Sequence, residues 1–177
     1  VAADSAMQAT IVDSVSSYVA ALDANIIATS QVELDGRRNS VRGLETNEGN
    51  MIADAMLWQA NKNAASFGVP QAQIGIQNGG GIRNNNLLPA GPITELNTFD
   101  MLPFSNFVTI VEGITPARFK EMMENSVSRI TGSGPQGSGT GRFAQIAGFS
   151  IVYDSTATPL LYDVNDNIIQ QGSRIWE

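Results

Sequence analysis

Apolar side chains recur every three or four residues in three stretches of the chain, the spacing that places them on one face of a helix. The first stretch predicts an amphipathic opening helix over residues 3–22, which we interpret as a packing or linker helix. The second covers residues 51–58 and follows Thr46 and Asn47, either of which is a residue type suited to cap a helix. The third, residues 116–130, follows Thr115 as its cap and opens with proline, so the sequence predicts three amphipathic helices.

Short β-prone segments bounded by turn residues lie between and after these helices. They cover residues 26–29, 32–34, 73–77, 107–112, 143–153, 160–162 and 174–176. Residues 94–101 are expected to form a short helix or turn. We therefore predict an α+β domain with a mixed β-sheet flanked by helices. Residues 1–24 would be its opening or linker helix and residues 25–177 the domain itself, whose last strand stops so abruptly that we expect the natural protein to continue.

The composition excludes several classes of function. The 177 residues carry a net charge of −7, which argues against nucleic acid as a partner because phosphate backbones attract basic surfaces. No run of about 18 apolar residues occurs, so the sequence predicts no membrane span. The absence of histidine and cysteine excludes disulfides, a thiol nucleophile, a Ser-His-Asp triad and a histidine-rich metal centre in this segment. The carboxylates are scattered, and we interpret them as solvated acids over a magnesium or calcium site.

The sequence Asn-Gly-Gly-Gly-Ile-Arg at residues 78–83 carries the clearest candidate chemistry. Glycines have no Cβ, so this backbone can adopt positive φ and a ligand can approach Gly80 closely. The amide of Asn78 offers donors and acceptors, and the guanidinium of Arg83 offers a fork suited to phosphate or carboxylate. A glycine turn of this kind also occurs as plain architecture between two elements. Because it follows a predicted strand, we interpret it as a candidate site for a small polar anion.

Two further segments contribute groups of the same kind. Arg42 precedes a loop, residues 45–50, at a predicted helix N-terminus, where free N–H groups and the helix dipole favour anions. Phe104 lies in a loop just before a β-prone segment, although an isolated phenylalanine can equally belong to the core. Two arginines, an amide and an aromatic ring together suit a nucleotide, since they can contact its phosphate or ribose, the edge of its base and the face of its base.

The glycine- and serine-rich loop at residues 132–141 contains a literal match to the G-x-G-x-x-G pattern of dinucleotide-binding sites. Its context differs, because it follows a predicted helix and precedes a predicted strand, whereas that pattern joins a strand to a helix. We therefore interpret this loop as a connector.

Four motifs, in matching order and spacing, resemble the C-terminal domain of the 5′-nucleotidase family, which includes 5′-nucleotidases and UDP-sugar hydrolases. They are Arg42-x-x-Glu45-Thr46-Asn47-x-Gly49-Asn50 with Asp54-Ala55, the turn from Asn78 to Arg83, Leu102-Pro103-Phe104-x-Asn106 with the helix from Thr115, and Phe143-x-Gln145-x-x-Gly148-Phe149-x-Ile151-x-Tyr153-Asp154. The agreement extends over almost the whole chain, and four linked motifs are far more specific than any one of them.

The resemblance implies a two-domain enzyme of which this chain is one part. The absent N-terminal domain would be a calcineurin-like metallophosphoesterase that holds two divalent metals, so no metal, cofactor or catalytic residue is expected in this chain. The present domain would bind the nucleotide or nucleoside. Arg42 and Arg83 would contact its sugar–phosphate side, Asn78 would bind the base with Gly80 in the same turn, and Phe104 would form one wall of an aromatic clamp.

The resemblance also sets the expected activity. The intact protein would hydrolyse a nucleoside monophosphate to nucleoside and phosphate, or a related nucleotide sugar, in the periplasm or outside the cell, and this chain alone would be inactive. The second clamp aromatic and the ribose-binding aspartate of the family have no counterpart up to Glu177, so we expect a half-built pocket. The alternative is a non-catalytic module that kept the fold but binds another ligand or partner.

Overall fold

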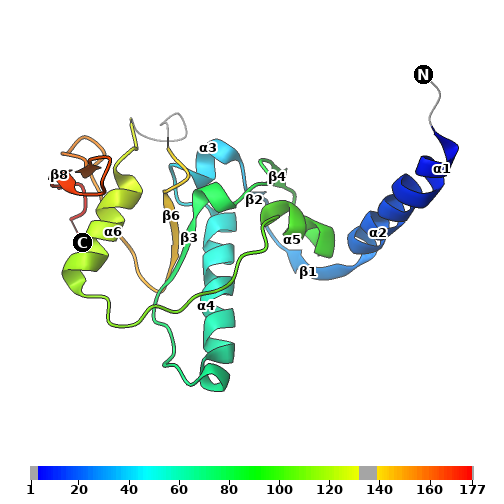
Figure 1. Ribbon diagram of the computed structural model, residues 1–177, viewed down its shortest axis with the longest axis horizontal. Helices are drawn as coiled ribbons and strands as arrows, with labels where there is room; N and C mark the ends of the chain where they lie inside the picture. Colours follow the sequence, from blue (N-terminus) through cyan, green and yellow to red (C-terminus); the bar gives the residue numbers. More distant parts are fainter. Residues whose placement is uncertain (1–3, 132–138, 177) are drawn as a thin grey trace.

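The computed structural model describes residues 4–131 and 139–176 and is built around one long helix, α4 (Asn47–Phe67), near the centre of Figure 1. Thr46 caps this helix as predicted, since its hydroxyl accepts an N–H of the first turn at 3.0 Å. Gly68, at a left-handed φ of 67°, ends it, because a residue in this conformation lets the carbonyls of the last turn find donors. The predicted helix is confirmed and continues beyond its expected end.

Two antiparallel strands pack against α4 and lead into the glycine turn. β3 (Gly75–Asn78) pairs with β6 (Ala144–Ala147), and both contact α4. A Cβ on Gly75 would lie 2.7 Å from the carbonyl oxygen of Ala53, so glycine is what lets the strand approach the helix this closely. The 3₁₀ turn η2 (Gly79–Gly81) follows β3 directly, which places the glycines at the end of a strand as predicted.

The other described strands form three further two-stranded pairs, all antiparallel. They are β1 (Ile26–Ser30) with β5 (Gly91–Thr94), β2 (Leu34–Asp35) with β4 (Leu87–Leu88), and β7 (Leu161–Tyr162) with β8 (Ile168–Gln170). The α+β class is confirmed. Within the described residues the strands divide into these short pairs, where the sequence pattern predicts a single mixed sheet.

Three shorter helices complete the body of the fold. α3 (Arg38–Val41) precedes α4, and α5 (Glu95–Met101) follows β5 at the position where a short helix or turn is predicted. α6 (Pro116–Val127) begins as predicted, because Thr115 caps it and proline occupies its first turn. The local start signals of the sequence therefore place these helices correctly.

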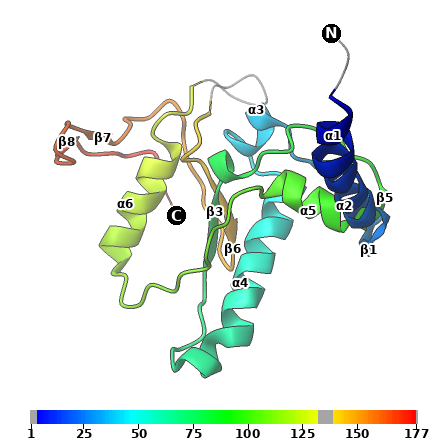
Figure 2. The same cartoon turned by 45° about the vertical axis from the view of Figure 1, so that its right-hand side comes forward.

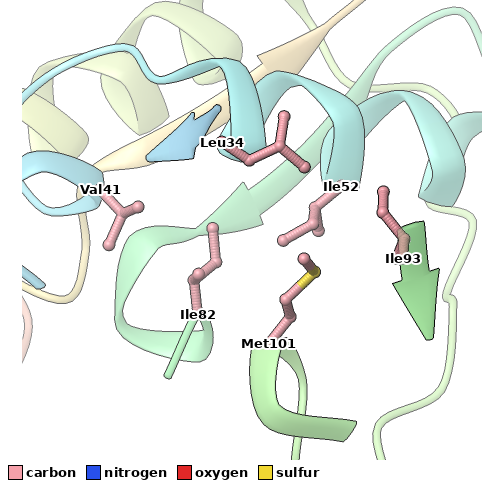
Figure 3. Packing of buried hydrophobic residues seen from close by; sticks show 6 residues of the cluster. All are labelled: Leu34, Val41, Ile52, Ile82, Ile93 and Met101. Carbon is pink, nitrogen blue, oxygen red and sulfur yellow. The ribbon is translucent and has the colours of Figure 1, made fainter. Parts of the chain in front are cut away.

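The core consists of two apolar clusters. The first is shown in Figure 3 and consists of Leu34, Val41, Ile52, Ile82, Ile93 and Met101. The second lies against α6 and consists of Met123, Val127, Ile130, Phe143 and Ile175. Ile82, which follows the glycine turn directly, is 2% exposed. The first cluster therefore anchors one end of the glycine turn in the core.

The predicted opening helix is continuous through α1 (Ser5–Met7), a π-helical turn (Gln8–Val12) and α2 (Asp13–Ala24). It extends away from the body in Figure 1, and its C-terminal end lies beside α5 in Figure 2. Asn25 joins the two elements, because its Nδ2 donates to Glu95 Oε2 at 2.8 Å. The apolar residues of the helix that are exposed include Met7, Ile11, Val15 and Val19. The division of the chain at residue 24 stays a prediction.

Three β-prone segments differ from the prediction. Residues 107–112 form no strand, because β propensity is expressed only where a neighbouring strand is available, and no described strand pairs with this segment. Residues 143–153 form a strand only over β6, since the chain turns at Gly148, which has a φ of 84°. Residues 174–176 contribute an isolated bridge in place of a strand.

The glycine-rich pattern at residues 132–137 lies outside the described residues, so its interpretation as a connector stays a prediction. Among the helices that the structure describes, none combines the length and the apolar character needed to cross a bilayer. The longest of them, α4, packs against β3 and β6, and its exposed residues include Asp54, Gln59 and Lys62 as well as Trp58 and Phe67.

Candidate functional site

The glycines of η2 lie against a second backbone segment. The N–H of Gly80 donates to the carbonyl oxygen of Gly141 at 2.9 Å, and a Cβ on Gly80 would lie 2.8 Å from the Gly141 Cα. A Cβ on Gly79 would overlap with the carbonyl oxygen of Val41. None of the three glycines has a positive φ, so that expectation is wrong. Gly79 and Gly80 are needed because another backbone segment approaches each of them too closely for a side chain, whereas a Cβ on Gly81 would overlap with the Gln77 side chain.

Asn78, at the end of β3, is exposed, and its amide already takes part in the turn. Its Nδ2 donates to the carbonyl oxygen of Gly141 at 3.0 Å, and its Oδ1 accepts from Gln77 Nε2 at 3.3 Å. Within the described contacts this leaves one Nδ2 hydrogen and one Oδ1 lone pair for a ligand. The predicted contact of Asn78 with a base stays a prediction.

Arg83 and Phe104 come from separate loops and lie against each other. The guanidinium carbon of Arg83 is 5.6 Å from the centroid of the Phe104 ring. The backbone N–H of Arg83 donates to the carbonyl oxygen of Met101 at 2.9 Å, which joins the end of the glycine turn to the end of α5. Both side chains are exposed, and an exposed cation–π contact contributes only about 0.5–1 kcal/mol. The backbone therefore places this pair, and the two side chains remain accessible.

Arg42 lies at the C-terminal end of α3 and is half-buried. Its Nε is buried and has no hydrogen-bond acceptor among the described residues. Burial, followed by the positive charges of Arg38 and Arg83, lowers the pKa of the Arg42 guanidinium. Neither described ion pair involves any of these three arginines. Their combined field favours an anion at this end of the glycine turn.

Arg38 is a residue of this surface that the sequence analysis did not single out. It is exposed and lies one helical turn before Arg42, and its backbone N–H donates to Asn85 Oδ1 at 2.9 Å. Its signal in the sequence is the spacing of two arginines four residues apart, since residues at this spacing lie close together on a helical surface.

Gln145 holds the backbone on both sides of Arg42. Its Nε2 donates to the carbonyl oxygens of Val41 at 3.0 Å and Leu44 at 2.8 Å, and its Oε1 accepts the N–H of Thr46 at 3.3 Å. The side chain is 1% exposed, so these bonds form in a dry environment. Gln145 thereby fixes the Arg42 loop against β6. The sequence indicates Gln145 only as the one amide side chain within the otherwise apolar strand β6.

The candidate site is an open surface at the end of β3. A cavity of about 680 Å³ lies elsewhere, between α4, β3 and the segment Asn106–Ile114, and none of the predicted site residues lines it. Within the described ranges, no group of three or more acidic side chains lies close enough together to hold a metal ion. The groups that this surface offers to a ligand are guanidinium, amide and aromatic.

Comparison with known proteins identifies relatives of this domain. The sequence model described as "5′-nucleotidase, C-terminal domain" matches residues 26–176. The chain is 35% identical over 133 residues to the trifunctional nucleotide phosphoesterase protein YfkN of Bacillus subtilis (strain 168), a match that covers 75% of this chain and 8% of that protein. It is 35% identical over 133 residues to the 5′-nucleotidase of Homo sapiens, covering 72% of this chain and 21% of that protein.

A solved structure extends the similarity to the fold. The 5′-nucleotidase precursor from Thermus thermophilus matches with a TM-score of 0.68 at 31% sequence identity, over 93% of this chain and 27% of that chain. The chain therefore spans less than a third of the length of each of these three relatives. Its similarity to them concerns one domain of much longer proteins.

Proposed function

The chain belongs to the 5′-nucleotidase C-terminal domain family, and we propose that it is the substrate-binding and specificity domain of a two-domain, metal-dependent 5′-nucleotidase. In this proposal the intact enzyme hydrolyses a nucleoside monophosphate to nucleoside and phosphate, or a related nucleotide sugar. The chain described here supplies recognition, and a preceding catalytic domain supplies the metals.

The observation that carries the proposal is the contact between Arg83 and Phe104 beside the glycine turn. A phenylalanine ring that is 52% exposed offers a face on which a base can stack. The adjacent guanidinium offers paired donors to phosphate or ribose oxygens. Asn78, in the same turn as Gly80, adds an amide for the edge of the base.

The other arginines support an anionic ligand. A buried guanidinium Nε without an acceptor is unfavourable, and Arg42 carries one beside two more positive charges. A phosphate or ribose oxygen bound beside these arginines would balance the charge of Arg38 and Arg42. This arrangement favours a ligand with an apolar ring at one end and a negative charge at the other.

The role of this domain in catalysis is binding and orientation. When present in the intact enzyme, two divalent metals on the catalytic domain supply an activated water and stabilise developing charge. The donor groups of this chain do not suit such metals, because its site consists of guanidinium, amide and aromatic groups. Binding energy from the base and ribose can be used to align the phosphoester, which accounts for a large share of many enzymatic rate accelerations.

We place the intact protein in the periplasm or outside the cell. The family resemblance supports this location, and the acidic, cysteine-free composition is compatible with export. A measurement of the protein in the separated cell fractions of its source tests the placement.

The test of the proposed activity uses the full-length protein that contains this chain. Phosphate release from AMP is measured with divalent metal for the unchanged protein, for Arg83→Ala and for Arg118→Ala, an exposed arginine that pairs with Glu121 away from the site. We expect Arg83→Ala alone to lower kcat/KM by about tenfold to a hundredfold, with unchanged metal content. Loss of metal in Arg83→Ala would contradict the assignment, and binding without hydrolysis would favour the non-catalytic module.

A further inference from the structure

Two buried oxygen atoms near the arginines have no hydrogen-bond partner among the described residues. They are Oε1 of Glu48, in the first turn of α4, and Oδ1 of Asn84, directly after Arg83. The Glu48 side chain is fully buried, at 0% exposure. Burying a carboxylate oxygen without a donor is costly, so this pair of orphaned acceptors needs an explanation.

The orientation of the Asn84 amide is fixed by its neighbours. Its Nδ2 donates to Glu48 Oε2 at 3.0 Å and to Asn86 Oδ1 at 3.0 Å, which uses both hydrogens. A flipped amide would place its oxygen against these two acceptors, so the flip is unfavourable. A Cβ on Gly36 would overlap with Glu48 Oε1 and with both amide atoms of Asn84. The two orphaned oxygens therefore face the same side of Gly36 and are neighbours of each other.

One proton satisfies both oxygens. If Glu48 keeps its proton on Oε1, that hydroxyl donates to Asn84 Oδ1, while Oε2 continues to accept from Nδ2. The carboxylic acid and the amide then form a cyclic pair of hydrogen bonds with every buried acceptor used. No additional volume, ion or water is needed, which suits a site closed on one side by Gly36.

The electrostatics around Glu48 agree with this arrangement. Burial is the largest influence and raises the pKa of the Glu48 carboxyl, and the negative charge of Asp35 on β2 raises it further. The hydrogen bond from Asn84 acts in the opposite direction. The N-terminal end of α4 also favours a carboxylate. Asp35 itself is held by Arg37 in an ion pair of 2.8 Å, which moderates its effect on Glu48. The net direction is upward.

We propose that Glu48 is a positioning residue that keeps its proton in the folded chain over a pH range in which exposed glutamates are ionised, and that its cyclic pair with Asn84 holds the backbone next to Arg83. Three segments meet at this pair: the first turn of α4, the corner at Gly36 that leads into α3, and the loop between the glycine turn and β4. These segments carry the arginines of the candidate site. The expected effect of Glu48 on ligand binding rests on the proposed function, whereas its protonation state does not.

The first experiment measures thermal stability against pH for the unchanged chain and for Glu48→Gln. Glutamine reproduces the neutral pair, because its Nε2 donates to Asn84 Oδ1 and its Oε1 accepts from Nδ2. A folded-state pKa above the ordinary value of 4.5 means that Glu48 supports the fold at low pH and that this support is lost as pH rises to the folded pKa. The melting temperature of Glu48→Gln should therefore equal that of the unchanged chain at about pH 4. Near neutral pH it should be higher by about 3–5 °C for each pH unit by which folding raises the pKa of Glu48.

A matched control comes from the other fully buried glutamate. Both carboxylate oxygens of Glu124 accept backbone N–H groups, from Arg174 at 3.0 Å and Ile175 at 2.9 Å. Glu124→Gln places an amide donor against one of these N–H groups, so it should lower the melting temperature near neutral pH, where Glu48→Gln is expected to raise it. The proposal would be overturned if the melting temperatures of Glu48→Gln and the unchanged chain differed by the same amount at every pH. It would also be overturned if Glu48→Gln lost stability as Glu124→Gln does.

The second experiment separates this inference from the proposed function. AMP is titrated into the full-length protein that contains this chain and into its Glu48→Gln variant at the same series of pH values, so that ionisation of the ligand cancels in the ratio of the two affinities. We expect the two proteins to bind AMP with equal affinity at low pH. Above the folded-state pKa of Glu48, the unchanged protein should bind AMP about threefold to tenfold more weakly than Glu48→Gln. If neither protein binds AMP, the proposed function fails while the stability series still decides the state of Glu48. A constant ratio of affinities overturns the positioning role.

Discussion

The guanidinium of Arg83 lies 5.6 Å from the centre of the Phe104 ring, although the two residues belong to different loops. The contact exists because the backbone of Arg83 is bonded to the last turn of α5, from which the loop of Phe104 departs. A rigid turn and a helix end thus present a cation and a ring side by side. This relationship gives the candidate site its shape without any contribution from a cavity.

Phe104→Ala should weaken binding of nucleosides with little effect on folding. Loss of a stacking surface costs about 1–3 kcal/mol per base, which corresponds to an affinity lower by about fivefold to a hundredfold. The ring is 52% exposed, so the melting temperature should change by only a few degrees. Phe107→Ala is the matched control, because Phe107 lies three residues further along and is 93% exposed. Equal affinities for the two variants would remove Phe104 from the site.

Gly80→Ala should damage both the turn and ligand binding. The new Cβ would lie 2.8 Å from the Gly141 Cα, so one backbone must move, at a cost of about 1–3 kcal/mol of unfolding free energy. Gly113→Ala is the control: Gly113 has a φ of +70° with no atom within 4 Å of a Cβ, so the cost there is only about 1–2 kcal/mol of backbone strain. Urea unfolding and AMP titration of both variants check this. Unchanged AMP affinity in Gly80→Ala would contradict the role of the turn.

Gln145→Leu should destabilise the chain and disorder the loop of Arg42. The change leaves two carbonyls and one N–H of this loop without their buried partner, which costs about 2–5 kcal/mol. The free energy of unfolding in urea measures the effect. Gln170→Leu, which removes one bond to the Pro159 carbonyl far along the chain, should cost about 1 kcal/mol or less. Similar losses for both variants would show that Gln145 has no special role.

Arg42→Met should have opposite effects on stability and on binding. In the free chain the change removes a buried Nε without an acceptor and relieves repulsion from Arg38 and Arg83, so stability should rise by up to about 1 kcal/mol. Affinity for AMP should fall by about tenfold, whereas affinity for adenosine should change little, because the arginine is assigned to the phosphate side. Thermal melting and parallel titrations of the two ligands measure this. Equal losses for AMP and adenosine would contradict the assignment.

The elements whose signals are local could be predicted from the sequence. A cap at Thr46, a Thr-Pro start at Thr115 and a glycine turn after a short apolar run each depend on neighbouring residues, and the structure has all three where expected. The segment 107–112 shows the limit. Its side chains favour a strand, but a strand also needs a partner that the local sequence does not specify, and no described strand pairs with it.

The supporting contacts of the site could not be predicted from the sequence for the same reason. Gln145 is bonded to residues about a hundred positions earlier in the chain, and Glu48 meets Asn84 across 36 residues. No pattern of spacing indicates such contacts, because they arise only when strands and helix ends pack together. Arg42 and Arg83 could be singled out from motifs, whereas Arg38 and the contacts that hold these loops in place required the fold.

Calorimetric titration of adenosine and AMP into the full-length protein that contains this chain, without added metal, tests the central claim most directly. The account predicts saturable binding of one ligand per chain, tighter for AMP than for adenosine, and weakened by both Phe104→Ala and Arg83→Ala. Circular dichroism of the same samples establishes that each variant is folded. A folded protein that binds neither ligand would contradict the assignment of this surface to nucleotide recognition.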